Sequence, residues 1–186
     1  GRLLLITSSG FTRRGITSRM RDLLGHDRLW VMDRAAPNPD LDDLDRMALK
    51  YRSEPPSGII GLGGGSVLDS AKVLGSILDS TSEKPLDATL RHGNREGFQR
   101  KTHVLAIPTT AGTGAEVTPF ATVWDRQQGA KHSLTGNTVL PDQALLDPEL
   151  LLSLPHLETL YTGLDTVSHA LESLWNTNRT PVSEAW

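Results

Sequence analysis

Cysteine is absent from the 186 residues, so disulfide bonds, a thiol nucleophile and thiolate metal ligands are excluded for this chain. Long apolar runs are absent as well, because the longest are far shorter than the roughly 20 residues that cross a bilayer. No basic region followed by an apolar one, as in a secretory signal, opens the sequence. These absences favour a cytoplasmic protein without membrane contacts.

An excess of positive charge is also lacking. The sequence has 19 basic and 22 acidic residues and a formal net charge of −3, so we expect no nucleic-acid partner. The length allows one medium domain and part of a second. Because the chain opens directly on an apolar run and ends on Pro181–Trp186, which resembles a helix start, we expect it to be a piece of a longer protein.

Strand and helix patterns alternate along the first two thirds of the chain. Buried-strand runs are predicted at Leu3–Thr7, Leu29–Met32, Ile59–Leu62 and His103–Ile107. Amphipathic helices are predicted at Arg14–Leu24, Asp40–Arg52 (with Asp40 as N-cap) and Ser66–Leu78. This order predicts an α/β fold with a Rossmann-like parallel sheet and helices on both faces.

The pattern changes after the fourth strand. Ala121–Trp124 and Lys131–Leu134 flank a turn-rich stretch and predict a β-hairpin attached to the sheet, and Gln143–Leu146 predicts one more strand. Beyond Pro155 the pattern is helical. We therefore predict an α/β domain over residues 1–154 and the beginning of an all-α domain over residues 155–186.

A glycine-rich turn joins the third strand to its helix. Gly63, Gly64 and Gly65 allow a ligand to approach the backbone, and the positive end of the helix dipole suits a pyrophosphate. Ser66 is expected to cap this helix, with Asp69 completing a capping box. The turn lacks a Walker lysine and departs from G-x-G-x-x-G. A tight turn without a ligand is the alternative interpretation.

A threonine-rich segment, Ile107–Thr118, follows the fourth strand; we call it the threonine segment. It starts at the carboxyl end of a parallel strand, where open α/β sheets bind ligands. The hydroxyls of Thr109, Thr110 and Thr113 can donate to phosphate or ribose oxygens. A turn held by local side-chain bonds explains the segment equally well when it is read alone.

Together these motifs resemble the iron-containing (group III) alcohol dehydrogenase family. The similarity covers almost the whole chain, in the expected order and spacing. Its parts are Gly63–Lys72, Ile107–Thr118, Pro141–Asp142, Leu146–Glu149 and Thr162–Glu172. The resemblance implies a dehydroquinate synthase-like nucleotide-binding domain that takes NAD or NADP.

The resemblance also implies roles for single residues. The glycine turn would hold the pyrophosphate, and the threonine segment would reach adenine and ribose. Lys131 in the hairpin would contact the nicotinamide side, and Leu150 would pack near the nucleotide. Ser8 stands where many NAD-preferring members have an aspartate, so NADP(H) is expected to be accepted.

Asp165 and His169 share one helix face at i and i+4. Alone, such a pair is more often a surface interaction than a metal site. The resemblance implies the first two ligands of Fe²⁺ (or Zn²⁺), with two histidines from a later part of the family's sequence completing the site. The other histidines match no ligand position. They are His26, His92, His103, His132 and His156.

The implied activity is hydride transfer between NAD(P)(H) and a primary alcohol or aldehyde, in a homodimer. The stretch Leu171–Ser183 resembles the phosphonoacetaldehyde reductase branch, where Asn176, Asn178 and Arg179 could donate to a phosphonate. Two alternatives remain open. One is a glycerol dehydrogenase-like or dehydroquinate synthase-like member of the superfamily, and the other is a nucleotide-binding module without catalysis.

Overall fold

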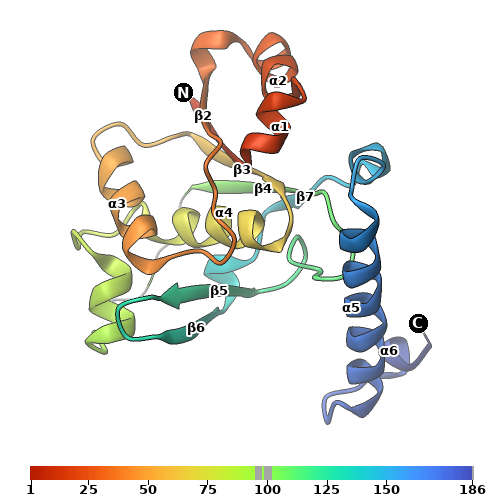
Figure 1. The fold of residues 1–186 in the computed structure, drawn as a ribbon. Helices are drawn as coiled ribbons and strands as arrows, with labels where there is room; N and C mark the ends of the chain where they lie inside the picture. Colours follow the sequence, from red (N-terminus) through yellow and green to blue (C-terminus); the bar gives the residue numbers. More distant parts are fainter. Residues whose placement is uncertain (95–97, 99–101, 186) are drawn as a thin grey trace.

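The computed structural model describes residues 1–94, 98 and 102–185. Within them, five parallel strands form one sheet in the order β2-β1-β3-β4-β7 (Figure 1). These strands are β1 (Leu3–Thr7), β2 (Leu29–Met32), β3 (Gly58–Gly63), β4 (His103–Pro108) and β7 (Gln143–Ala144). The predicted parallel α/β sheet is confirmed, although its last strand is shorter than Gln143–Leu146.

Helices cover both faces of this sheet. They are α1 (Ser9–Arg13), α2 (Ile16–Leu24), α3 (Leu41–Tyr51) and α4 (Gly65–Ile77). Asp40 caps α3 as predicted, because its carboxylate accepts a hydrogen bond from the Asp43 N–H at 3.1 Å. The single helix predicted over Arg14–Leu24 is wrong at its start. Gly15 has φ of 80°, and this left-handed residue separates α1 from α2.

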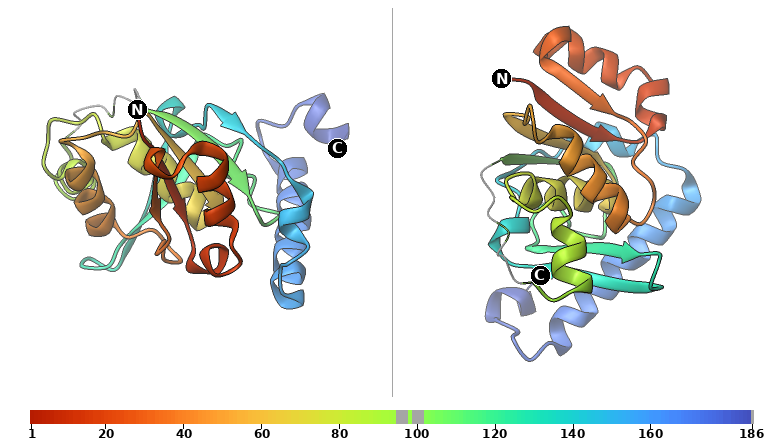
Figure 2. Two further views of the ribbon diagram at one scale, coloured as in Figure 1. Left: turned by 90° about the horizontal axis from the view of Figure 1, so that it is seen from above. Right: turned by 90° about the vertical axis from the view of Figure 1, so that its left-hand side faces the viewer.

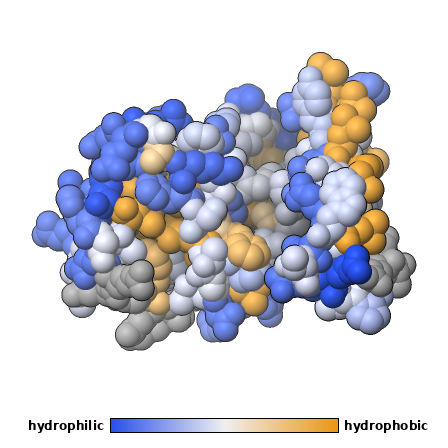
Figure 3. All heavy atoms as spheres, turned by 90° about the horizontal axis from the view of Figure 1, so that it is seen from below, coloured by the Kyte–Doolittle hydropathy of each residue, from blue (hydrophilic) through white to orange (hydrophobic). Residues whose placement is uncertain are grey.

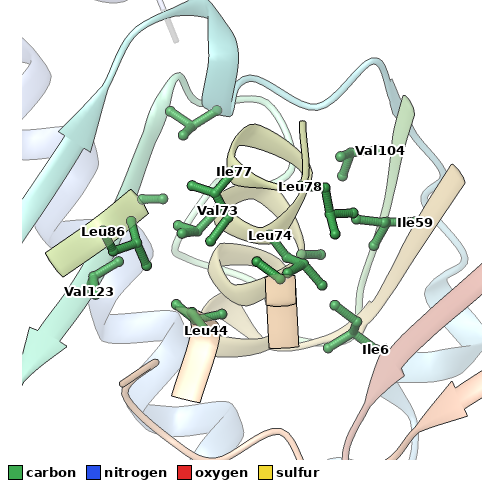
Figure 4. Packing of buried hydrophobic residues seen from close by; sticks show 14 of the residues in the cluster. Ile6, Leu44, Ile59, Val73, Leu74, Ile77, Leu78, Leu86, Val104 and Val123 are labelled. Atoms are coloured by element: carbon green, nitrogen blue, oxygen red, sulfur yellow. The ribbon is translucent and has the colours of Figure 1, made fainter. Parts of the chain in front are cut away.

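Helices lie on both sides of the parallel sheet (Figure 2), and alternate residues of its strands face the two sides. Leu4 and Ile6 of β1 pack with α3 and α4, whereas Leu5 faces α1 and α2. α4 is buried on nearly every side, since it lies between the sheet and the hairpin, and Figure 4 shows Val73, Leu74 and Ile77 at the centre of this packing. The sheet and α4 therefore form the rigid base from which the loops project.

The predicted hairpin is confirmed as β5 (Phe120–Asp125) and β6 (Ala130–Thr135), which pair antiparallel. Among the described residues it forms a sheet of its own and does not pair with the parallel strands. Val123 and Leu134 pack against α4 in the main core. The hairpin is thus attached through α4, and its other face is free to border a site.

A buried arginine also fixes the hairpin to the helices. Arg91, at the end of the π-helical turn Asp87–Arg91, donates to both carboxylate oxygens of Asp125 at 2.6 and 2.7 Å. It also donates to both oxygens of Asp42 in α3 at 3.0 Å. These hydrogen bonds hold the pKa values of Asp125 and Asp42 below their usual range. The arrangement locks β5, α3 and the turn together.

The C-terminal helices are α5 (His156–Trp175) and α6 (Pro181–Ala185). α5 runs along one side of the molecule, and every residue along it is exposed or half-buried (Figure 1). Figure 3 shows apolar side chains gathered over this edge. The exposed ones are Leu157, Leu160, Tyr161, Leu164, Val167, Leu171, Leu174 and Trp175. In the described part of the chain, no helix is long and apolar enough to span a membrane.

Candidate dinucleotide and metal site

The carboxyl ends of β1, β3 and β4 meet where the strand order reverses. The chain leaves β1 for β2 on one side and then crosses back, so that β3 lies on the other side of β1. Loops diverge at such a point and leave a crevice, which is the usual ligand position in open parallel sheets. A cavity of about 740 Å³ opens there. We call it the larger cavity.

Most of the predicted cofactor residues line the larger cavity. They are Ser8, Gly63, Gly64, Gly65, Ser66, Thr109, Thr110, Thr113 and Leu150. They come from four stretches that are distant in the sequence: the ends of β1, β3 and β4, and the 3₁₀ turn Pro148–Leu151. Phe11, Arg13 and Arg14 border the same space from the region of α1. The structure therefore brings the predicted residues together around one concave surface.

The glycine turn brings the backbone of α4 close to its neighbours. A Cβ at Gly63 would lie 2.6 Å from Val67, and one at Gly65 would lie 3.1 Å from Thr113. Larger residues would fill the space in which the loop meets the threonine segment. α4 starts at Gly65, and the N–H groups of a helix's first turn lack intrahelical partners. This turn is suited to an anionic group.

The predicted capping box is wrong. Gly64 is the N-cap of α4, with no side-chain hydrogen bond to the cap. The hydroxyl of Ser66 instead accepts from the Asn38 N–H at 3.2 Å, and the carboxylate of Asp69 accepts from the Thr122 N–H at 2.9 Å. The glycine backbone moves the helix start one residue earlier, so both side chains are released for contacts with other segments.

A smaller cavity of about 410 Å³ adjoins the larger one. Gly65, Ser66 and Thr113 line both cavities, so the two spaces meet at the start of α4. The hairpin supplies Trp124 and Lys131 to the smaller cavity. The Lys131 ammonium lies 5.9 Å from the centroid of the Trp124 ring. A long ligand can therefore extend from one cavity into the other.

A buried ion pair supports the floor of the smaller cavity. Lys72 is fully buried in α4, 3.5 Å from the carboxylate of Asp69, which itself lines the cavity. The Lys72 ammonium also donates to the carbonyls of Ala115, at 2.9 Å, and Phe120. Burial lowers the pKa of Lys72 and raises the pKa of Asp69, and their mutual attraction opposes both shifts. Sequence reasoning missed Lys72, because a lysine in a helix usually faces solvent.

Asp165 and His169 border the smaller cavity from α5. The Asp165 carboxylate and the His169 Nδ1 atom are 3.9 Å apart, and both side chains are about half-exposed. Nδ1 lies 2.8 Å from the Gly112 carbonyl oxygen. Since a carbonyl can only accept, Nδ1 is the donor in this hydrogen bond, and Nε2 is the nitrogen left free to face the cavity. The structure thus brings the predicted pair into the lining of the same cavity as Gly65 and Ser66.

This donor set fits a divalent ion in part. A carboxylate oxygen and a neutral imidazole nitrogen are ligands that Fe²⁺ and Zn²⁺ accept, and a hydrogen-bonded second nitrogen is usual in such sites. Within residues 1–94, 98 and 102–185, no group of three or more His, Asp or Glu is placed to hold a metal. The described residues could therefore supply two ligands, and a complete site would need further ligands from another part of the protein.

Other candidate residues lie outside both cavities. His26, His92 and His103 lie near the carboxylates of Asp22, Asp87 and Asp142. Asn176, Asn178 and Arg179 follow the end of α5, where Arg179 donates to the Leu174 carbonyl at 3.4 Å. Neither cavity includes these residues in its lining, so the structure lends no support to a phosphonate contact by this group.

The site is thus a crevice at the switch point of a parallel α/β sheet, with a glycine turn at a helix start on one side and an Asp/His pair beside it. The profile of the family described as iron-containing alcohol dehydrogenase matches residues 1–148. The chain belongs to this family. The resemblance seen in the sequence is thereby confirmed.

Individual relatives agree with this assignment. The chain is 34% identical to 1-propanol dehydrogenase PduQ of Citrobacter freundii, over 97% of this chain and 45% of that protein. It is 34% identical to phosphonoacetaldehyde reductase of Streptomyces viridochromogenes, over 100% and 47%. The crystal structure of sulfoacetaldehyde reductase from Bifidobacterium kashiwanohense in complex with NAD⁺ superposes with a TM-score of 0.88 at 30% identity, over 99% and 48%. The chain spans between 21% and 47% of the curated relatives it matches.

Proposed function

We propose that the full-length protein transfers a hydride between NAD(P)(H) and a primary alcohol or aldehyde, and that this chain supplies the cofactor site and half of the metal site. The observation that carries the proposal is the meeting of the two cavities at Gly65, Ser66 and Thr113. One cavity has the lining of a dinucleotide site, and the other has Lys131 and the Asp165/His169 pair. A dinucleotide that spans both would present its nicotinamide to the metal side.

In this proposal each segment has a separate task. The N-terminal turn of α4 holds the pyrophosphate, and the hydroxyls of Thr109, Thr110 and Thr113 bond phosphate or ribose oxygens. Ser8 faces the adenosine ribose, Leu150 packs near the nucleotide, and Lys131 contacts the nicotinamide side. Asp69 orders the hairpin through the Thr122 N–H, which keeps Lys131 over the smaller cavity.

Asp165 and His169 would hold two positions around Fe²⁺ or Zn²⁺. The ion, when bound, supplies Lewis acidity that polarises a carbonyl or stabilises an alkoxide. The chain's own residues orient the nicotinamide and narrow the space beside it. The related sulfoacetaldehyde reductase has been crystallised in complex with NAD⁺, which supports NAD as a cofactor. We also propose that residues 1–154 and 155–186 belong to two domains, and that the whole protein is a cytoplasmic homodimer.

Equilibrium titration of the full-length protein with NAD⁺ and NADP⁺ tests the cofactor site. We expect saturable binding of at least one of them, and a Kd raised about tenfold or more by Gly64→Val, which fills the space beside Thr110. Gly163→Val is the matched control, because a Cβ at Gly163 meets open space. Unchanged affinity in Gly64→Val would contradict the assignment. Binding without turnover of any primary alcohol or aldehyde would favour a module without catalysis.

A further inference from the structure

The threonine segment lies between the larger cavity and α5 and touches both. On the cavity side, the Thr109 N–H donates to the Gly63 carbonyl at 3.0 Å. A Cβ at Gly64 would lie 3.4 Å from Thr110, and one at Gly65 would lie 3.1 Å from Thr113. The segment is thus in van der Waals contact with the turn proposed to hold the pyrophosphate.

On its other side the segment reaches α5 through Gly112. The Gly112 carbonyl accepts the hydrogen bond from His169 Nδ1 at 2.8 Å. Gly112 has φ of 106°, and a Cβ there would lie 2.5 Å from the Thr162 carbonyl oxygen and 3.1 Å from the Asp165 carboxylate. Backbone conformation and close contact therefore both require glycine at this point.

The segment is also held along its length. Lys72 donates to the Ala115 carbonyl at 2.9 Å and to the Phe120 carbonyl, and its ammonium is fully buried. These bonds fix the end of the segment to α4, while Thr109 fixes its beginning to the glycine turn. A loss of mobility in the residues between these two anchors therefore also limits the movement of the Gly112 carbonyl.

We infer that the threonine segment couples nucleotide binding to metal binding, with the Gly112 carbonyl as its connection to His169. This inference rests on the proposed function of the two cavities. A nucleotide that accepts hydrogen bonds from Thr110 and Thr113 restricts the segment. The His169 imidazole would then have a fixed partner for Nδ1, so that it could bind a divalent ion at a smaller cost in conformational entropy. The coupling is reciprocal, because each ligand raises the affinity for the other by the same factor.

Calorimetry with ADP-ribose tests the coupling, because this probe lacks the nicotinamide ring. The full-length protein is stripped of divalent metal, and a second sample is reloaded with one equivalent of Zn²⁺. We expect the Kd for ADP-ribose to be about fivefold lower, or more, in the zinc form. Equal Kd values in the two forms would overturn the inference while leaving the two sites intact. No binding of ADP-ribose, or no retention of zinc, would reject the proposed function and the inference with it.

Two glycine variants separate coupling through the segment from direct contact between the ligands. Gly112→Ala displaces the segment from α5 and is expected to abolish the effect of zinc on the Kd for ADP-ribose. Gly114→Ala is the matched control, because Gly114 also has positive φ (59°) but its Cβ would meet only Thr118, at 3.8 Å. We expect it to keep the zinc effect. A zinc effect of full size in folded Gly112→Ala protein would overturn the inference, and the wild-type comparison decides alone if that variant does not fold.

Discussion

Ser8 is the residue at which we expect one side chain to influence the choice between NAD(H) and NADP(H). It follows β1 and lines the larger cavity together with Arg13 and Arg14. A hydroxyl here does not repel a 2′-phosphate, and the two arginines add positive charge on the same side. We therefore expect NADP(H) to be accepted by the full-length protein, with an affinity similar to that for NAD(H) or higher.

The substitution Ser8→Asp should make the protein discriminate against NADP(H). The new carboxylate would lower the affinity for NADPH by about tenfold and leave NADH binding nearly unchanged, because only NADPH carries a negative charge at that position. Fluorescence titration with both reduced cofactors measures the ratio. Ser9→Asp is the control, since Ser9 is the next residue and does not line either cavity. A wild type that already discriminates strongly against NADPH would contradict the argument.

The predicted site residues were found from short motifs, and the supporting roles of other residues in the same motifs were missed for a physical reason. Glycines and threonines at strand ends are visible because their chemistry is local. Lys72 and Gly112 act through partners more than 40 positions away, Ala115 and His169. The Ser66 cap was mispredicted because two glycine backbones can start a helix without a side-chain cap. A single sequence therefore indicated the residues that line the larger cavity better than those that hold its loops in place.

At the scale of elements, buried runs and capping residues predicted β1, β2 and the start of α3 at the observed residues. Boundaries failed where backbone conformation decided them, as at Gly15 between α1 and α2. The π-helical turn Asp87–Arg91 was not predicted at all. Its conformation depends on Asp42 and Asp125, which are distant in the sequence, so no local pattern reports it.

Arg91 with Asp42 and Asp125 should make the stability of the hairpin's attachment to α3 depend on pH. The pKa of Asp125 and that of Asp42 are lowered in the fold by hydrogen bonds from Arg91. The two carboxylates therefore stabilise the fold fully at pH values above the pKa of an unfolded aspartate, about 3.9. This stabilisation is lost as the pH falls from there through their lowered pKa values in the folded state. Arg91→Met removes this contribution and leaves the buried carboxylate of Asp125 without its cationic partner, held among the described residues only by the N–H groups of Gln127 and Gln128.

Urea unfolding at several pH values measures the expected difference. At neutral pH the free energy of unfolding should be clearly lower for Arg91→Met than for the wild type, and the gap should narrow as the pH falls below about 4. Arg46→Met is the control, because Arg46 pairs with Asp43 on the exposed face of α3. A gap that stays constant down to acid pH would show that the ion pairs are not the source of stability.

A further prediction concerns the binding of a divalent metal ion by residues of α5. The full-length protein should hold about one divalent ion per chain, if Asp165 and His169 bind it together with ligands from the rest of the protein, as we propose. His169→Ala should lose most of this metal. His156→Ala is the control on the same helix, since His156 lines neither cavity. Elemental analysis after gel filtration gives the content, and stoichiometric metal in His169→Ala would show that the ion is held elsewhere.

At the scale of the whole molecule, the exposed apolar residues along α5 indicate how this helix packs in the full-length protein. Soluble monomers rarely expose a contiguous stripe of this kind, so we propose that further helices of the full-length protein cover it. That arrangement would bring additional ligands towards Asp165 and His169. It also explains why the α/β domain has a complete core while α5 has none.

The last prediction concerns the aldehyde, which only the whole protein can select. Two relatives reduce short aldehydes with an anionic head group according to their names, whereas PduQ is named for 1-propanol. We expect the full-length enzyme to have a higher kcat/KM for phosphonoacetaldehyde than for propanal, by about tenfold, because the Lys131 ammonium lines the smaller cavity and can attract an anion. Arg179→Met should leave this ratio unchanged, since Arg179 lies outside both cavities. A preference for propanal would remove the phosphonate hypothesis, and a selective loss in Arg179→Met would move the anion contact to the end of α5.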